Sequence, residues 1–243
     1  MTRVYDLLGI INGLVLLLVL VLLLRGPFRK FWVVLGYVTW ELLATATLTI
    51  FNVLYGGPAQ GNGGAEAVRW YTRLYWSNDV IVDLLRFLLV ILLTYRASSG
   101  GVRRSTIGRI LGGIVAVVMV LPFLVFPLNF RPWPRASWFN STSELLNFGA
   151  AIMNLVLWGV LIANRKRDPQ LVGVSAGLGI VVTGTAISYG LRHFIPPEAR
   201  FLPNLFLMLT QLGGWTIWCR TFWLAPRQRP VAGPAANKAL PSL

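Results

Sequence analysis

Three ionisable residues, Asp79, Asp83 and Arg86, lie four and three positions apart in a stretch that is otherwise rich in apolar residues. At about 100° per residue, this spacing places the three side chains on one face of a helix. Charged groups inside a membrane are costly, so they usually face the interior of a helix bundle or a water-filled cavity. The spacing therefore predicts either a buried hydrogen-bonded network or a polar site that a ligand or an ion can enter.

Polar residues in other apolar segments could complete such a site, namely Glu41, Glu144, Asn147, Asn204 and Gln211. At about 1.5 Å per residue, Glu41 and Arg86 both lie roughly 15 Å from the ends of their segments, near the bilayer midplane. A pair between them would offset much of the cost of burying each charge. We expect Asp79, Asp83 and Glu144 to face one outward cavity beneath the loop that holds Trp133.

The charges of this candidate site do not balance. Four carboxylates, those of Glu41, Asp79, Asp83 and Glu144, accompany the single arginine Arg86. If every carboxylate were ionised, the site would have an excess of three negative charges, which a desolvated environment does not tolerate. We therefore expect that some carboxylates are protonated, or that a cation or a cationic small ligand enters from outside.

Several cofactor chemistries are excluded by residue type. A covalently bound retinal needs a lysine in the last helix of a seven-helix protein, but Lys30, Lys166 and Lys238 all lie outside the apolar segments. The single histidine, His193, cannot supply two haem or metal ligands, and we interpret it as an interfacial polar residue. The single cysteine, Cys219, cannot form an internal disulfide. The sequence predicts no cofactor, no metal site and no enzymatic activity.

Small residues at helical spacing favour packing over catalysis. The stretch from Gly173 through Ser175 to Gly177 matches the Gly-x-Ser-x-Gly nucleophile pattern, but it lies in an uninterrupted apolar segment rather than a strand–turn–helix. Gly173 and Gly177 are four positions apart, as are Gly108 and Gly112. Both pairs predict close approach of neighbouring helices.

The elements that must position these residues are membrane-spanning helices. The chain of 243 residues is 56% hydrophobic and 12% charged, a balance that favours lipid over water. Because a bilayer core about 30 Å thick requires roughly 20 apolar residues per helix, the chain can be searched for such segments. Seven are found: Leu7 to Leu24, Phe31 to Tyr55, Tyr75 to Tyr95, Ile107 to Leu128, Trp138 to Ala163, Leu171 to Leu191, and Phe201 to Leu224. The predicted fold class is an all-α, seven-helix transmembrane bundle.

Basic residues predict the orientation of this bundle. Fourteen lysines and arginines lie in one set of alternating connections and seven in the other. Because basic connections stay in the cytoplasm, the N-terminus is predicted outside and the C-terminus inside. The net charge of +14 therefore needs no nucleic-acid partner, and the cytoplasmic side would attract anionic lipid of the inner leaflet. We divide the chain into a seven-helix domain, residues 1–226, and a disordered basic Pro/Ala-rich tail, residues 227–243.

One local motif resembles a known group of proteins. The run Tyr75-Trp76-Ser77-Asn78-Asp79 follows an aromatic stretch that begins at Trp70. It resembles a group of bacterial seven-helix membrane proteins in which Tyr-Trp precedes an acidic residue, more often glutamate than the aspartate found here. The resemblance covers residues 1–226 and implies a multi-pass protein of the bacterial inner membrane. It implies no activity.

Three functions remain open. The leading hypothesis is a non-enzymatic sensor-like or accessory module that binds a small ligand or a membrane partner through an outward-facing polar pocket. Because we expect no output domain, such a module would pass its signal to another membrane protein or act as a homo-oligomer. The alternatives are a small proton- or cation-coupled transporter and a structural subunit of a larger membrane complex.

Overall fold

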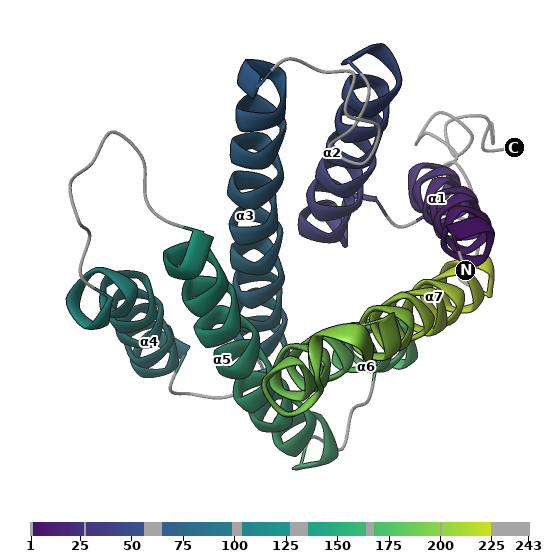
Figure 1. Ribbon diagram of the computed structural model, residues 1–243. Coiled ribbons are helices and arrows are strands. Elements are labelled where there is room, and N and C mark those ends of the chain that lie inside the picture. The colour runs from purple at the N-terminus through teal and green to yellow at the C-terminus, as the bar shows by residue number, and fades with distance from the viewer. Residues whose placement is uncertain are drawn as a thin grey trace, which may run out of the picture.

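The computed structural model describes residues 2–26, 28–55, 65–98, 104–126, 136–163, 168–199 and 201–224, and nearly all of these residues belong to helices (Figure 1). The helices are α1 (Thr2–Arg25), α2 (Trp32–Tyr55), α3 (Ala65–Ala97), α4 (Arg104–Val125), α5 (Ala136–Ala163), α6 (Pro169–Phe194) and α7 (Phe201–Trp223). A 3-10 turn, η1 (Pro197–Ala199), lies between α6 and α7. The described part of the chain contains no strand, so the all-α class is confirmed.

Each predicted apolar segment corresponds to one helix. Five helices, α1, α2, α4, α5 and α6, are long and apolar enough to cross a membrane. The other two, α3 and α7, are not among these five, and they contain Asp83 and Gln211 within their apolar parts. The loop that holds Trp133 and the predicted tail, residues 227–243, lie outside the described residues.

The start of α3 differs from the prediction. The helix begins at Ala65 rather than Tyr75, because good helix formers precede the apolar segment and Glu66 occupies the first turn, where an acidic group suits the helix dipole. At about 1.5 Å per residue, its 33 residues span about 50 Å, which exceeds a bilayer core of about 30 Å. The first turns of α3 therefore extend beyond the apolar parts of the neighbouring helices.

Six helices pack in a closed ring, in which α1, α2, α3, α5, α6 and α7 each contact the next and α7 returns to α1. Helix α3 also contacts α6 across the ring. Helix α4 packs against α3 and α5 and lies at the left edge of Figure 1, away from α1 and α7. The ring interior is the place where buried polar groups from several helices can meet.

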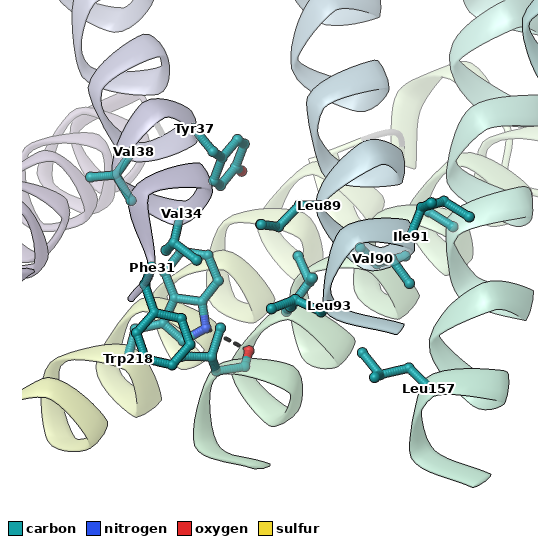
Figure 2. Close-up of a cluster of buried hydrophobic side chains, with 14 of the residues drawn as sticks. Phe31, Val34, Tyr37, Val38, Leu89, Val90, Ile91, Leu93, Leu157 and Trp218 are labelled. Carbon is teal, nitrogen blue, oxygen red and sulfur yellow. Dashed lines mark hydrogen bonds between the residues drawn. The ribbon is translucent and has the colours of Figure 1, made fainter. Parts of the chain in front are cut away.

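Apolar and aromatic side chains fill one end of the ring interior (Figure 2). Tyr37 of α2 packs against two adjacent tryptophans of α7, with its ring centroid 5.8 Å from that of Trp215 and 6.1 Å from that of Trp218. The Trp218 indole donates a hydrogen bond of 2.8 Å to the Val174 carbonyl of α6, drawn dashed in Figure 2. We call Tyr37, Trp215 and Trp218 the aromatic layer.

Helices α6 and α7 approach closely at two glycines. A Cβ on Gly177 would lie 2.8 Å from the Gly214 carbonyl oxygen and 2.4 Å from Trp218 Cδ1, so only glycine fits there. The predicted close approach at Gly177 is thus confirmed, whereas a Cβ on Gly112 of α4 would meet nothing within 4 Å. The close contact fixes the rotation of α7 that brings Trp218 into the ring.

Candidate functional site

A cavity of about 720 Å³ opens at the end of the bundle where α6 ends and α7 begins, which is the predicted outer end. Its lining comes from α3, α5, α6 and α7 and consists of Tyr75, Trp76, Asn140, Glu144, Tyr189, Arg192, His193, Asn204, Leu207 and Met208. Volumes between about 300 and 1,000 Å³ are usual for small-molecule sites. We call this space the outer cavity.

Groups of both charge signs line the outer cavity. The Glu144 carboxylate lies 2.9 Å from His193 Nε2, which joins α5 to α6. Arg192 donates a hydrogen bond of 2.8 Å to Asn204 Oδ1, and its guanidinium carbon lies 4.7 Å from the centroid of the Tyr189 ring. Asn140 lines the cavity, and its Oδ1 is buried without a hydrogen-bond partner among the described residues.

Tyr189 connects the outer cavity to the ring interior. This buried residue lines the cavity, and its hydroxyl donates a hydrogen bond of 2.7 Å to Asp79 Oδ2. The Ser143 hydroxyl donates a longer hydrogen bond of 3.4 Å to the same oxygen. Asp79 is therefore held behind the cavity wall by groups from α5 and α6.

Below Asp79 lies a buried charged network centred on Arg86, whose side chain is only 4% exposed. Arg86 Nη1 donates to Asp83 Oδ1 at 2.9 Å, and Nε donates to the Tyr37 hydroxyl at 3.0 Å. The third nitrogen, Nη2, lies 3.6 Å from Glu41 Oε1. We call Tyr37, Glu41, Asp83 and Arg86 the buried cluster, and its Tyr37 is also part of the aromatic layer.

Three acceptors in or beside this cluster have no hydrogen-bond partner among the described residues: Glu41 Oε2, Asp83 Oδ2 and Asn147 Oδ1. The Asn147 side chain is fully buried, and its amide nitrogen donates to the Ser143 carbonyl at 2.8 Å. A buried acceptor without a donor costs about 1–3 kcal/mol, so each needs an explanation.

The structure divides the predicted site residues into two layers. Glu144 and Asn204 line the outer cavity, whereas Arg86, Asp83 and Asn147 are buried beneath it. The expectation that Asp79, Asp83 and Glu144 share one cavity differs from this geometry, because Glu144 turns toward His193 while Tyr189 covers Asp79.

Two further predicted residues are also placed. Glu41 lies beside Arg86 as the depth argument expected, although Asp83 is the nearer carboxylate. Gln211 is half-buried on α7 and is not among the described residues that line the outer cavity.

Four contributors were missed by sequence reasoning: Tyr37, Ser143, Tyr189 and, as a partner of Glu144, His193. The two tyrosines lie within apolar segments, where their rings fit the hydropathy pattern and conceal the hydroxyl groups. One feature of the sequence could have identified Tyr189 and His193 as site residues: they are four positions apart and so share a helix face.

The arrangement can bind charged groups. Arg192 is a second cation beside Arg86, so the four carboxylates exceed the arginines by two rather than by three. Among the described residues, no group of three or more histidine, cysteine or acidic side chains is arranged to hold a metal ion. No protein-family model matches the chain, and neither the curated proteins nor the solved structures contain a significantly similar protein.

Proposed function

We propose that this chain is a non-enzymatic bacterial inner-membrane module of seven spans, which binds a small ligand in the outer cavity and transmits binding to a membrane partner. The observation that carries the proposal is the outer cavity itself, with the charged groups Glu144 and Arg192 and the polar residues Asn140 and Asn204 in its wall. Such convergent polar groups in a cavity of this size are typical of ligand sites.

The charge of the surroundings favours a ligand with a cationic, hydrogen-bond-donating group. Glu144 lies in the cavity wall, and the carboxylates of Asp79, Asp83 and Glu41 lie below it, against Arg192 and Arg86. A cation in the cavity would experience a net attraction if these carboxylates are ionised. The Glu144 carboxylate would accept its hydrogen bonds.

Two features support seven spans although α3 and α7 are not among the five helices that are apolar enough on their own to cross a membrane. Both belong to the closed ring, and the polar side chains of α3, Asp83 and Arg86, are buried inside it rather than facing lipid. The distribution of basic residues then supports an outer N-terminus and a cytoplasmic C-terminus.

The orientation is testable with single cysteines in a Cys219→Ser background. Glu198→Cys, in the exposed turn between α6 and α7, should react with an impermeant thiol reagent on intact cells, because that turn lies on the proposed outer side. Phe28→Cys, in the exposed turn between α1 and α2, should react only after the cells are lysed. Labelling of Phe28→Cys but not Glu198→Cys on intact cells would reverse the orientation.

Ligand binding is testable with three probes of similar size and different charge: ethylammonium, glycine and acetate. We expect ethylammonium to raise the Tm of the purified protein most, because its ammonium group can bind the Glu144 carboxylate in the cavity wall. Glu144→Gln should weaken ethylammonium binding about tenfold or more, since a hydrogen bond to a charged group is worth about 1.5–3 kcal/mol. The measurement is a titration of Tm against probe concentration.

The matched control is Glu198→Gln, which removes an exposed carboxylate that is not among the cavity-lining residues. It should leave ethylammonium binding unchanged. A Tm that responds to none of the probes, or equally in both variants, would contradict a cationic site in the outer cavity.

A second candidate, a proton- or cation-coupled transporter, is favoured by the buried cluster beneath the cavity. Transport requires that the cluster also open to the opposite side, where Trp215 and Trp218 of the aromatic layer pack against Tyr37. Purified protein in liposomes distinguishes the two functions: a transporter should couple ethylammonium uptake to proton movement, whereas a sensor-like module should bind the probe without flux.

A further inference from the structure

A second cavity, of about 510 Å³, lies at the end of the bundle opposite the outer cavity, where α7 ends and α6 begins. Three parts of the chain contribute to its lining: the turn before α2, the start of α6 and the last turns of α7. Its lining includes Lys30, Asp168, Gln170, Ile217, Arg220 and Leu224. In the proposed orientation this is the cytoplasmic end, where the helices meet the headgroups of the inner leaflet. We call this space the inner cavity.

Packing contacts hold the walls of the inner cavity together. Phe31, next to Lys30 in the chain, packs edge-on against Phe222 of α7, with ring centroids 5.8 Å apart. Helices α6 and α7 are in close contact beside the cavity, because a Cβ on Gly173 would overlap the side chain of Thr221, which lines the cavity. The backbone that carries the basic groups is therefore supported by buried apolar contacts and by close helix packing.

Side-chain donors exceed side-chain acceptors in the inner cavity. Lys30 Nζ lies 2.7 Å from Asp168 Oδ2 and donates to Gln170 Oε1 at 2.9 Å, which occupies two of its three N–H groups. Asp168 Oδ1 accepts a bond of 3.1 Å from the Gln170 backbone N–H. The exposed Arg220 has no hydrogen-bond or ion-pair partner among the described residues, although a guanidinium has five donors. The carboxylate and the amide oxygen are thus occupied, while Arg220 and one N–H of Lys30 remain available.

The inner cavity combines this basic part with an apolar part. Two cations, Lys30 and Arg220, accompany the single carboxylate of Asp168, so the charged side chains in the lining favour an anion with several acceptor oxygens, such as a phosphate group. Ile217 and Leu224 line the same cavity, and Leu224 is 68% exposed. A soluble anion would use only the basic part, whereas an anionic lipid would use both.

We propose that the inner cavity binds one anionic phospholipid, with its phosphodiester group held by Arg220 and Lys30 and an acyl chain lying along Ile217 and Leu224. Basic pockets between membrane helices on the cytoplasmic side bind acidic lipid headgroups in this way. A zwitterionic lipid fits less well, because its own cation cancels the phosphate charge that the surplus arginine attracts. The site is independent of the ligand in the outer cavity, which lies at the other end of the bundle.

Titration of the full-length protein in a neutral detergent tests the lipid site, with dioleoylphosphatidylglycerol, dioleoylphosphatidylcholine and inorganic phosphate as probes. We expect a saturable rise in Tm that is largest with phosphatidylglycerol. Arg220→Gln should raise the phosphatidylglycerol concentration at half-saturation about tenfold, because it removes charge-assisted hydrogen bonds to the phosphate. The measured quantity is the lipid-dependent rise in Tm, so a variant with a different basal Tm remains informative.

Arg109→Gln is the matched control, because it removes the same charge from an exposed position on α4 that does not line the inner cavity. It should leave the half-saturation concentration unchanged. An equal increase in Arg109→Gln and Arg220→Gln would overturn the proposal in favour of diffuse attraction to the basic end of the bundle. An equal response to phosphatidylcholine would show that the cavity does not recognise charge, and an equal response to inorganic phosphate would assign it to a soluble anion.

Discussion

Replacing Arg86 with glutamine should destabilise the helix ring by about 3–5 kcal/mol, because it leaves buried acidic groups without their only cationic neighbour in the buried cluster. Arg86 is 4% exposed and contacts Tyr37, Glu41 and Asp83 at once. Glu41→Gln should cost less, since the Asp83 and Tyr37 bonds to Arg86 remain. The measurement is the free energy of unfolding in a mixed-detergent titration.

The double variant Glu41→Gln with Arg86→Gln completes the test. The double variant removes both members of the Glu41–Arg86 pair and leaves no uncompensated Glu41 carboxylate, so it should recover part of the stability lost in Arg86→Gln alone. Arg109→Gln, at an exposed position on α4, is the matched control and should be nearly neutral. A double variant no more stable than Arg86→Gln would show that Glu41 and Arg86 are not coupled.

Hydropathy was sufficient to predict the seven helices, because lipid requires long apolar segments that satisfy their own backbone hydrogen bonds. Spacing within one helix also predicted correctly that Asp83 and Arg86 share a face and contact each other. Depth along the membrane placed Glu41 near Arg86, and the two side chains lie 3.6 Å apart. These predictions use only the spacing of residues along a helix and the length of each apolar segment, and both can be read directly from the sequence.

The division into two layers could not be predicted in this way, because it depends on how each helix is rotated and tilted against its neighbours. Glu144 and Asp79 have similar predicted depths, yet Glu144 contacts His193 while Asp79 contacts Tyr189. Their partners are fixed by the packing of α5 and α6 in the ring. Close contacts such as that between Gly177 and Gly214 set these rotations, and no periodicity within one helix specifies them.

The aromatic layer should contribute the second-largest single effect. Trp218 is fully buried, donates to the Val174 carbonyl and packs against Tyr37 and Trp215. Because lipid tails are as apolar as the ring interior, lost packing and the lost hydrogen bond, rather than transfer from water, determine the cost of truncation. Trp218→Ala should therefore lower the free energy of unfolding by about 3 kcal/mol or more, since it leaves a cavity beside Gly177.

Two variants separate packing from the hydrogen bond. Trp218→Phe keeps an aromatic ring but removes the indole donor, so it should cost about 1–3 kcal/mol through the unpaired Val174 carbonyl and the smaller volume. Trp223→Ala, five residues further along α7 and 72% exposed, should change stability by less than about 0.5 kcal/mol. The same detergent titration measures all three variants. Equal losses in Trp218→Ala and Trp223→Ala would mean that α7 does not hold Trp218 inside the ring, and the barrier between the buried cluster and the end of the bundle opposite the outer cavity would then have to lie elsewhere.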